Sequence, residues 1–203
     1  MPASAIRKLV PFADAAKKQG VKVYHLNLGQ PDIKSPVCAL DAVRNYSFEN
    51  VSYSHSAGLM ELRKGLVEKY YKKIGIDLTV DELIVTVAGS ESVNLALEIT
   101  CNPGDEVIVL EPFYTNYNTF AFMNGLTLKA IPTDIRNGFQ IPPIEEFEKA
   151  ITDKTKAILV CNPGNPTGTQ YSKESMLALG EIARKDDLFL LSDEVYRVFC
   201  YTD

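Results

Sequence analysis

Four short motifs place polar or aromatic residues directly after apolar, largely β-branched runs of the sequence. The motifs are AGS at 88–90, EPFY at 111–114, NPGNPTG at 162–168 and SDEVY at 192–196. Such runs are typical of buried strands in a parallel sheet. Ligands of open α/β sheets collect beyond the carboxyl ends of the strands, so these motifs contain the candidate ligand-binding residues.

The first motif has the composition of an anion site. A strand that enters a helix through Ala88 and Gly89 leaves backbone N–H groups pointing at one spot, with the helix dipole behind them, and the Ser90 hydroxyl adds a donor. The alternative is that Ser90 is only a helix N-cap and Gly89 a tight-turn residue. The dinucleotide-binding pattern GxGxxG and the P-loop pattern are both absent.

The second and third motifs offer an aromatic ring and an amide. The ring of Tyr114 could stack on a planar ligand, although its position also fits an aromatic core stripe of a helix that contains Phe113, Tyr117 and Phe120. Two prolines fix the loop at 162–168 at the expense of backbone donors. A simple turn does not require two prolines, so the composition favours a functional loop. In such a loop the side chain of Asn165 can donate to a ligand oxygen.

The fourth motif presents a carboxylate and a phenol. Asp193 follows the apolar run 188–191, and a carboxylate at that edge can hold a proton on a heteroaromatic nitrogen. Tyr196, three residues on, can reach the same ring if the turn is helical. The alternative is that Asp193 is a helix cap.

The composition is that of an ordinary globular protein. The chain has 203 residues, of which 46% are hydrophobic and 23% charged. A net charge of −5 argues against a nucleic-acid partner. No apolar run is long enough for a membrane span and the N-terminus lacks the pattern of a signal peptide, so we expect a cytoplasmic location. Neither a disulfide framework nor a metal site is expected from four scattered cysteines, Cys38, Cys101, Cys161 and Cys200.

The hydrophobic pattern alternates between strands and helices. From residue 59 onward we expect strands at 83–87, 106–110, 127–131, 156–161 and 188–191, and helices at 59–70, 90–100, 113–123, 144–151 and 173–185. Nearer the N-terminus we expect helices at 4–20 and 37–49 and a strand at 23–28. This order predicts an α/β fold whose mostly parallel sheet is sandwiched by helices.

Six segments in order resemble the class I aminotransferases, which are fold type I pyridoxal-phosphate enzymes typified by aspartate aminotransferase. They are LNLGQPD at 26–32, YSHSAGLMELR at 53–63, TVAGSESVNLAL at 86–97, PGDEVIVLEPFY at 103–114, NPGNPTG at 162–168 and SDEVY at 192–196. The resemblance covers essentially the whole chain. It implies that residues 1–45 form an N-terminal arm and the start of a small domain, and that 46–203 begin the large cofactor-binding domain.

The resemblance also implies roles for the candidate residues. Gly89 and Ser90, with the backbone of Ala88, would bind the phosphate of pyridoxal 5'-phosphate. Tyr114 would stack on its ring, at a position where many relatives carry tryptophan. The remaining cofactor contacts would come from Asn165 and Tyr196 at the phenolic oxygen and from Asp193 at the ring nitrogen, which makes Asp193 and Tyr196 catalytic.

Two further residues receive roles only through the resemblance. Tyr53 would reach the cofactor phosphate of the partner subunit in a homodimer. Gly29, together with Asn165, would contact the substrate. The implied partners are therefore an amino acid, a 2-oxo acid and a second copy of the chain.

The implied reaction is transamination between an amino acid and a 2-oxo acid, for which the family uses a Schiff-base lysine. That lysine is expected a few dozen residues beyond Asp193, and the sequence ends at Asp203. Ser172-Lys173 resembles a helix cap and first turn rather than the catalytic pair. We therefore expect this chain to be the N-terminal portion of such an enzyme, shortened at the C-terminus and inactive alone. A lyase or synthase of the same fold, or a non-catalytic dimerisation fragment, are the alternatives.

Overall fold

The computed structural model describes residues 7–27, 29, 31–47 and 49–201. These residues fall into two compact units. One unit contains residues 8–86 and the other contains Arg7 and residues 87–201. The second unit carries the sheet and all four motifs that follow its strands, so it is the unit that positions the candidate site.

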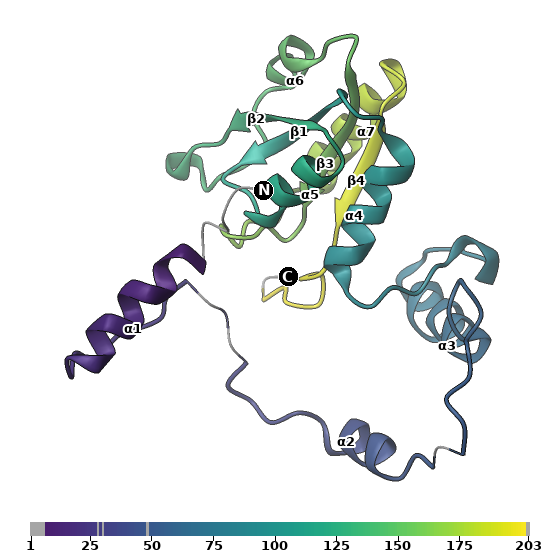
Figure 1. Cartoon of the computed structure of the whole chain (residues 1–203). Coiled ribbons are helices and arrows are strands. Elements are labelled where there is room, and N and C mark those ends of the chain that lie inside the picture. The colour runs from purple at the N-terminus through teal and green to yellow at the C-terminus, as the bar shows by residue number, and fades with distance from the viewer. Residues whose placement is uncertain (1–6, 28, 30, 48, 202–203) are drawn as a thin grey trace. The chain divides into compact units, whose positions relative to one another are not determined.

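The sheet has four parallel strands in the order β2-β1-β3-β4 (Figure 1). Its strands are β1 (Glu106–Glu111), β2 (Thr127–Pro132), β3 (Thr155–Cys161) and β4 (Phe189–Asp193). The register pairs Glu111 with Pro132 and Cys161 with Asp193, so strand ends are aligned. This confirms the predicted α/β fold with a parallel sheet.

Helices cover both faces of the sheet because its central strands are apolar on both sides. In β1, Val107 and Val109 pack toward α4 (Gly89–Thr100) and α5 (Asn116–Met123). Ile108 and Leu110 pack toward α6 (Ile144–Ala150) and α7 (Lys173–Lys185). The period-two alternation of a strand thus divides the core into two layers, and the predicted helices 90–100, 144–151 and 173–185 are confirmed within one residue at each end.

The predicted strand at 83–87 is not part of a sheet. Its backbone is extended at Leu83, but the Val85 N–H donates to the carbonyl oxygen of Ala57 at 3.0 Å, and Ala57 lies in a turn rather than a strand. Ile84 is 67% exposed. A β-branched sequence favours extended backbone, but a strand also needs a neighbouring strand to accept its hydrogen bonds. For the same reason, residues 23–27 of the predicted strand 23–28 have no regular structure, and Leu28 lies outside the described residues.

The unit of residues 8–86 is mostly helical. Its α-helices are α1 (Val10–Lys18), α2 (Val37–Arg44) and α3 (Met60–Leu66), and α3 continues into a π-helical turn at Val67–Tyr71 and a 3-10 turn at Lys72–Ile74. The predicted helix 59–70 therefore exists with an irregular second half, and the predicted helix 37–49 ends at Arg44. Pro11 lies in the first turn of α1, where a missing N–H costs nothing.

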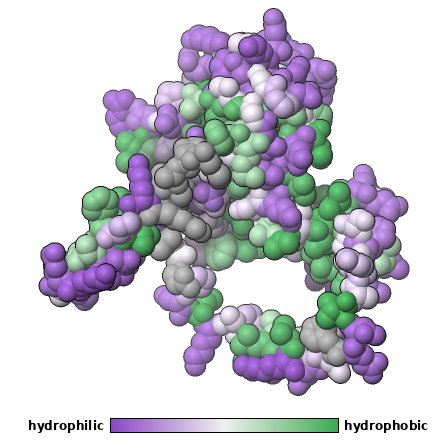
Figure 2. Space-filling view, in the orientation of Figure 1, coloured by the Kyte–Doolittle hydropathy of each residue, from purple (hydrophilic) through white to green (hydrophobic). Residues whose placement is uncertain are grey.

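Helices α1 and α2 bury none of their residues within the chain. Figure 2 shows hydrophobic residues along one side of α2 and hydrophilic residues along the other. Val37, Leu40 and Val43 are the exposed large apolar residues of this helix. Among the described residues, no helix combines the length and apolar character that crossing a bilayer requires.

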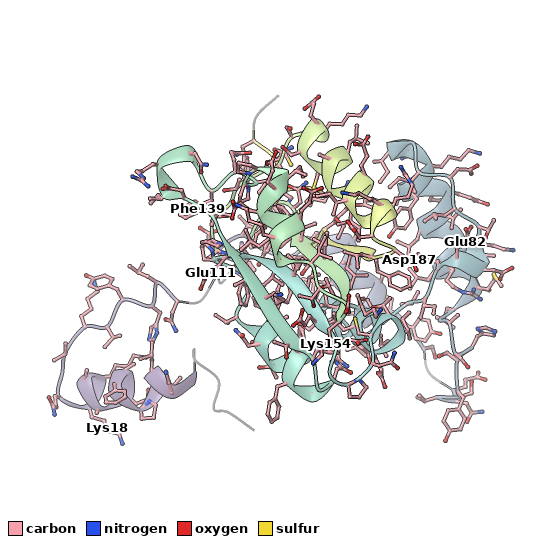
Figure 3. All side chains as sticks on the ribbon, turned by 90° about the horizontal axis from the view of Figure 1, so that it is seen from above. Lys18, Glu82, Glu111, Phe139, Lys154 and Asp187 are labelled. Atoms are coloured by element: carbon pink, nitrogen blue, oxygen red, sulfur yellow. The ribbon has the colours of Figure 1, made fainter. Side chains whose placement is uncertain are left out.

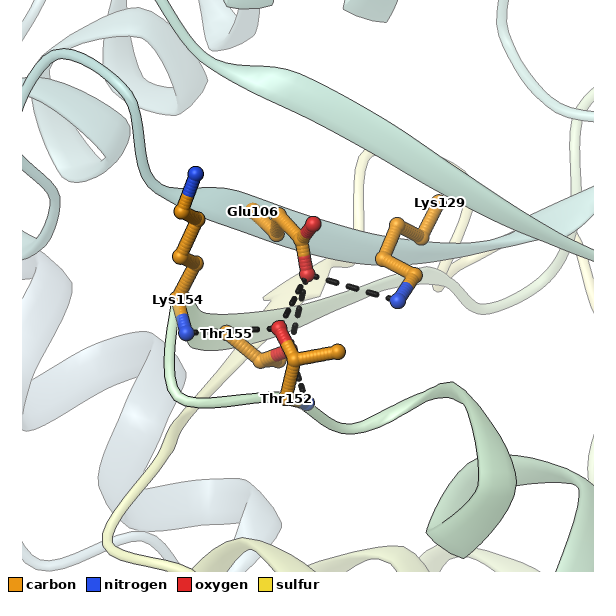
Figure 4. A network of polar contacts seen from close by, with 5 residues as sticks. All are labelled: Glu106, Lys129, Thr152, Lys154 and Thr155. Carbon is orange, nitrogen blue, oxygen red and sulfur yellow. Dashed lines mark hydrogen bonds and ion pairs between the residues drawn. The ribbon is translucent and has the colours of Figure 1, made fainter.

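The two edges of the sheet have different chemistry. Glu111 ends β1 and Lys154 precedes β3, and their labels mark opposite edges in Figure 3. At the amino edge, the carboxylate of Glu106 accepts hydrogen bonds from the hydroxyls of Thr152 at 2.6 Å and Thr155 at 3.4 Å, and it lies 3.4 Å from Lys129 Nζ (Figure 4). The network ties β1, β2 and the turn before β3 together.

The Glu106 network predicts a pH-dependent stability. The hydrogen bond from Thr152, supported by Lys129, holds the pKa of Glu106 below its ordinary value. A depressed carboxyl pKa stabilises the fold above the ordinary value of about 4.3, and this contribution disappears as the pH falls through the folded-state pKa. Glu106→Gln should lower the free energy of unfolding by about 1 kcal/mol at pH 7.

Urea unfolding at pH 7 and at about pH 3 measures this effect, since the Glu106→Gln and original chains should converge at the lower pH. Glu181→Gln, on the exposed side of α7, is the matched control. An equal loss of stability at both pH values would show that the charge of Glu106 contributes nothing.

Candidate functional site

A cavity of about 250 Å³ opens at the carboxyl edge of the sheet. That volume lies near the lower end of the range for small-molecule pockets, roughly 300 Å³. Residues from all four motifs line it, with apolar side chains between them: Ala88, Gly89, Ser90, Val93, Tyr114, Phe120, Cys161, Asn165, Asp193, Val195 and Tyr196. The convergence follows from parallel pairing, because strands that run the same way end at the same edge.

One end of the cavity is the N-terminus of α4. Ala88 is the N-cap residue and has no side chain that could accept a hydrogen bond from the first-turn amides. The alternative that Ser90 is the N-cap is therefore wrong, since Ser90 is the second residue of the helix. A β-carbon on Gly89 would lie 3.9 Å from Val195 Cγ2, which places the start of α4 beside the turn that follows β4. This end attracts anions through its amides and the helix dipole.

Asp193 adds a carboxylate to the cavity, a group that attracts cations or hydrogen-bond donors. Its Oδ2 accepts a hydrogen bond from the Tyr117 hydroxyl at 2.7 Å, and its Oδ1 accepts from the Val195 N–H at 3.2 Å. The residues after it form a turn rather than an α-helix, so Asp193 is not a helix cap. A carboxylate has about four lone-pair positions, so each oxygen retains the capacity to accept from a ligand.

Tyr114 lies at the cavity wall and is half-buried. Its ring meets the ring of Tyr117 edge to face, with centroids 5.6 Å apart and an interplanar angle of 87°. Its hydroxyl oxygen accepts from Asn116 Nδ2 at 2.6 Å. These two contacts fix the ring at both ends, so Tyr114 is a rigid aromatic wall rather than only a member of the core stripe.

The loop at 162–168 is braced by its own backbone. Gly164 donates to the carbonyl oxygen of Thr169 at 2.8 Å, and Gly168, at φ 71°, donates back to Gly164 at 2.8 Å. The Asn162 N–H donates to the carbonyl oxygen of Asp193 at 3.0 Å, which ties the loop to the end of β4. The loop therefore holds Asn165 in place over this edge of the sheet.

Asn165 and Tyr196 form a polar pair inside the cavity. Asn165 Nδ2 donates to the Tyr196 hydroxyl oxygen at 3.2 Å. Because that oxygen acts as the acceptor, the Tyr196 O–H proton remains directed elsewhere and can be given to a ligand oxygen. The pair can thus present two donors to one ligand oxygen.

The arrangement selects a ligand with three properties. The start of α4 favours an anionic group, Asp193 favours a protonated nitrogen, and Tyr114 offers a face for a planar ring between them. Asn165 and Tyr196 add donors for an oxygen substituent. A phosphorylated, hydroxylated pyridine satisfies all of these features at once. In the described part of the chain, no group of three His, Cys, Asp or Glu residues could hold a metal ion.

Two predicted site residues lie in the other unit. Tyr53 is fully exposed and Gly29 is exposed, both within residues 8–86. Their predicted contacts with a partner subunit and with substrate stay predictions.

Sequence reasoning missed the contact of Tyr117 with Asp193. The sequence predicted Tyr117 only as a member of an aromatic core stripe. In the structure it is 1% exposed, and its hydroxyl donates to Asp193, which lies 76 residues later in the sequence. A buried tyrosine needs a hydrogen-bond partner, so its phenol was the available signal. Cys161, at the end of β3, is half-buried at the cavity wall.

The family is settled by comparison with known proteins. Residues 21–203 match the family model of aminotransferase class I and II. The chain belongs to this family. It is 37% identical over 186 residues to the aspartate/prephenate aminotransferase of Thermus thermophilus, covering 91% of this chain and 48% of that protein. It is 34% identical to the aspartate aminotransferase of Thermotoga maritima, covering 100% of this chain and 54% of that protein.

Solved structures of aminotransferases have the same fold. The crystal structure of the Thermotoga maritima aspartate aminotransferase matches with a TM-score of 0.91 at 34% identity, over 100% of this chain and 54% of that one. An alanine aminotransferase from Pyrococcus furiosus matches with a TM-score of 0.89 at 35% identity, over 99% of this chain and 52% of that one. The chain therefore spans about half the length of the relatives it matches, and its fold is that of the fold type I pyridoxal-phosphate enzymes.

The anion end of the cavity can be tested with the cofactor that the family implies. Ser90→Ala removes the hydroxyl that the resemblance predicts to donate to the phosphate, and alanine is well tolerated in the first turn of a helix. Because hydrogen bonds to charged groups contribute about 1.5 kcal/mol or more, the affinity for pyridoxal phosphate should fall about tenfold. Fluorescence titration measures it.

Ser175→Ala, in the first turn of α7, is the control because that residue lies outside the cavity. Unchanged affinity in Ser90→Ala would mean that the phosphate is not bound at the start of α4.

Proposed function

We propose that this chain forms the cofactor cradle of a pyridoxal-phosphate-dependent aminotransferase, which exchanges an amino group between an amino acid and a 2-oxo acid. The observation that supports it most is the cavity with a helix N-terminus at one end, the Asp193 carboxylate near the other and the Tyr114 ring at the wall. Membership of the aminotransferase family supports the same reaction class.

The residues of the cavity fit the parts of this cofactor. Ala88, Gly89 and Ser90 hold its phosphate with amides and a hydroxyl. Asp193 keeps a proton on the ring nitrogen, and Tyr114 stacks on the ring. When bound, pyridoxal phosphate supplies an electron-withdrawing ring that stabilises negative charge at the substrate Cα.

Asn165 and Tyr196 hold the phenolic oxygen of the cofactor in this proposal. Their own hydrogen bond aligns both donors before a ligand arrives, which lowers the cost of ordering them on binding. By the family resemblance, Asn165 and Gly29 would also contact the substrate. In this proposal Tyr196 and Asp193 control the protonation of the cofactor, Tyr196 at the phenolic oxygen and Asp193 at the ring nitrogen.

The proton shuttle requires a lysine that the described cavity does not supply, since no lysine is among its lining residues. Lys173 begins α7 behind the N-cap Ser172, whose hydroxyl accepts from the Ser175 N–H at 3.1 Å. That geometry confirms a cap and first turn. We expect the lysine to come from a part of the whole protein outside residues 1–203, and the isolated chain to be inactive.

The remaining features of the family complete the proposal. The working form is a homodimer in the cytoplasm, in which Tyr53 reaches the partner's cofactor phosphate. Residues 1–45 are an arm and the start of a small domain, and residues 46–203 belong to the large domain. Aspartate is the favoured donor, because relatives are named as aspartate and aspartate/prephenate aminotransferases. An aromatic amino acid is the other donor that the resemblance implies.

Amino-group exchange by the whole protein tests the reaction. With aspartate and 2-oxoglutarate, glutamate should form, and Asp193→Ala should lower kcat/KM by about 10²–10⁴-fold because the ring nitrogen loses its partner. Asp153→Ala, in an exposed turn before β3, is the control. Release of pyruvate and ammonia from an amino acid without any acceptor would instead indicate a lyase.

The isolated 203-residue chain gives an independent test. Mixed with pyridoxal phosphate, it should show no visible absorbance band of a cofactor bound covalently to a cavity lysine, and borohydride reduction followed by peptide mapping should label no unique lysine. Labelling of a single lysine at high occupancy would contradict the expectation that this chain lacks the catalytic one.

A further inference from the structure

Tyr117 lies beneath the candidate site, in α5, and is 1% exposed. Its hydroxyl donates to Asp193 Oδ2 at 2.7 Å. A buried phenol without a partner would cost about 1–3 kcal/mol, so this contact satisfies the hydroxyl. It also places a fixed donor against Oδ2 of the carboxylate, the oxygen that does not accept from Val195.

The ring of Tyr117 is held by two aromatic neighbours. Phe113 stacks on it, with centroids 6.2 Å apart and an interplanar angle of 10°, and Tyr114 meets it edge to face at 5.6 Å. Ring packing of this kind restricts both torsion angles of the side chain. The hydroxyl position is therefore fixed by the core and not by a mobile side chain.

Tyr117 stays protonated, so its hydroxyl is always a hydrogen-bond donor. Burial, reinforced by the hydrogen bond to Asp193, raises the pKa of Tyr117 far above its ordinary value. The phenol thus keeps its proton at every working pH and always donates to the carboxylate. Cys161, whose own thiol pKa is raised by burial, also lies nearby and adds no charge.

We infer that Tyr117 is a positioning residue that fixes the Asp193 carboxylate for the ring nitrogen of the bound cofactor. Together Tyr117 and the Val195 N–H hold one carboxylate oxygen each, so the rotation of the carboxylate is restrained from both sides. The same tyrosine braces the Tyr114 ring. One buried side chain therefore aligns two surfaces of the cavity, the carboxylate and the aromatic wall. This inference rests on the proposed binding of pyridoxal phosphate.

The variant Tyr117→Phe tests it, because it keeps the ring packing and removes the hydroxyl. In the full 203-residue chain, fluorescence titration should show about tenfold weaker binding of pyridoxal phosphate. The 1-deaza analogue, whose ring nitrogen is replaced by carbon, should bind equally to both forms, since it offers Asp193 nothing to hold. Tyr171→Phe, which removes another half-buried hydroxyl, is the matched control and should bind both ligands like the original chain.

A double-mutant comparison separates positioning from general loosening of the fold. Adding Tyr117→Phe to Asp193→Ala should cause no further loss of affinity, because the hydroxyl acts only through the carboxylate. Equal weakening of both ligands, or full additivity with Asp193→Ala, would overturn the inference and leave the proposed function intact. Failure of the original chain to bind pyridoxal phosphate in preference to pyridoxal would overturn both the proposed function and this inference.

Discussion

Parallel pairing of β1, β3 and β4 is the constraint on which the site depends. The pairing brings the carboxyl ends of three strands to one edge, and the register of Cys161 with Asp193 aligns the loop after β3 with the turn after β4. Side chains that are separated by up to about a hundred residues in sequence therefore line one cavity. A register slip of one residue would turn Asp193 to the other face of the sheet.

The two ends of the cavity attract groups of opposite charge. The start of α4 attracts an anion, and Asp193 attracts a cation, so a ligand with both ends is oriented as well as bound. Much of this orientation exists before binding. The Asn165–Tyr196 pair, the braced loop and the Tyr117 contact to Asp193 are already in place, which reduces the ordering cost of association.

The sequence was a good guide wherever one local signal decided the structure. Apolar runs such as 106–110 predicted strands, and the residues directly after them predicted the cavity lining, because a strand end fixes where the next residue emerges. The sequence was a poor guide where the local structure depends on a residue or strand that is distant in sequence. The run 83–87 has strand composition but no strand beside it, and the contact of Tyr117 with Asp193 links residues that no local pattern connects. The alternative that Ser90 caps α4 was wrong because Ala88, two residues earlier and without a side chain that could cap, occupies the N-cap.

A crystal structure of the 203-residue chain saturated with pyridoxal phosphate tests the central claim most directly. The account predicts one bound molecule in the cavity, with its phosphate at the amides of Gly89 and Ser90, its ring against Tyr114 and its ring nitrogen facing Asp193. A molecule bound in the reverse orientation, with the phosphate away from α4, or bound only at surface lysines outside the cavity, would contradict it.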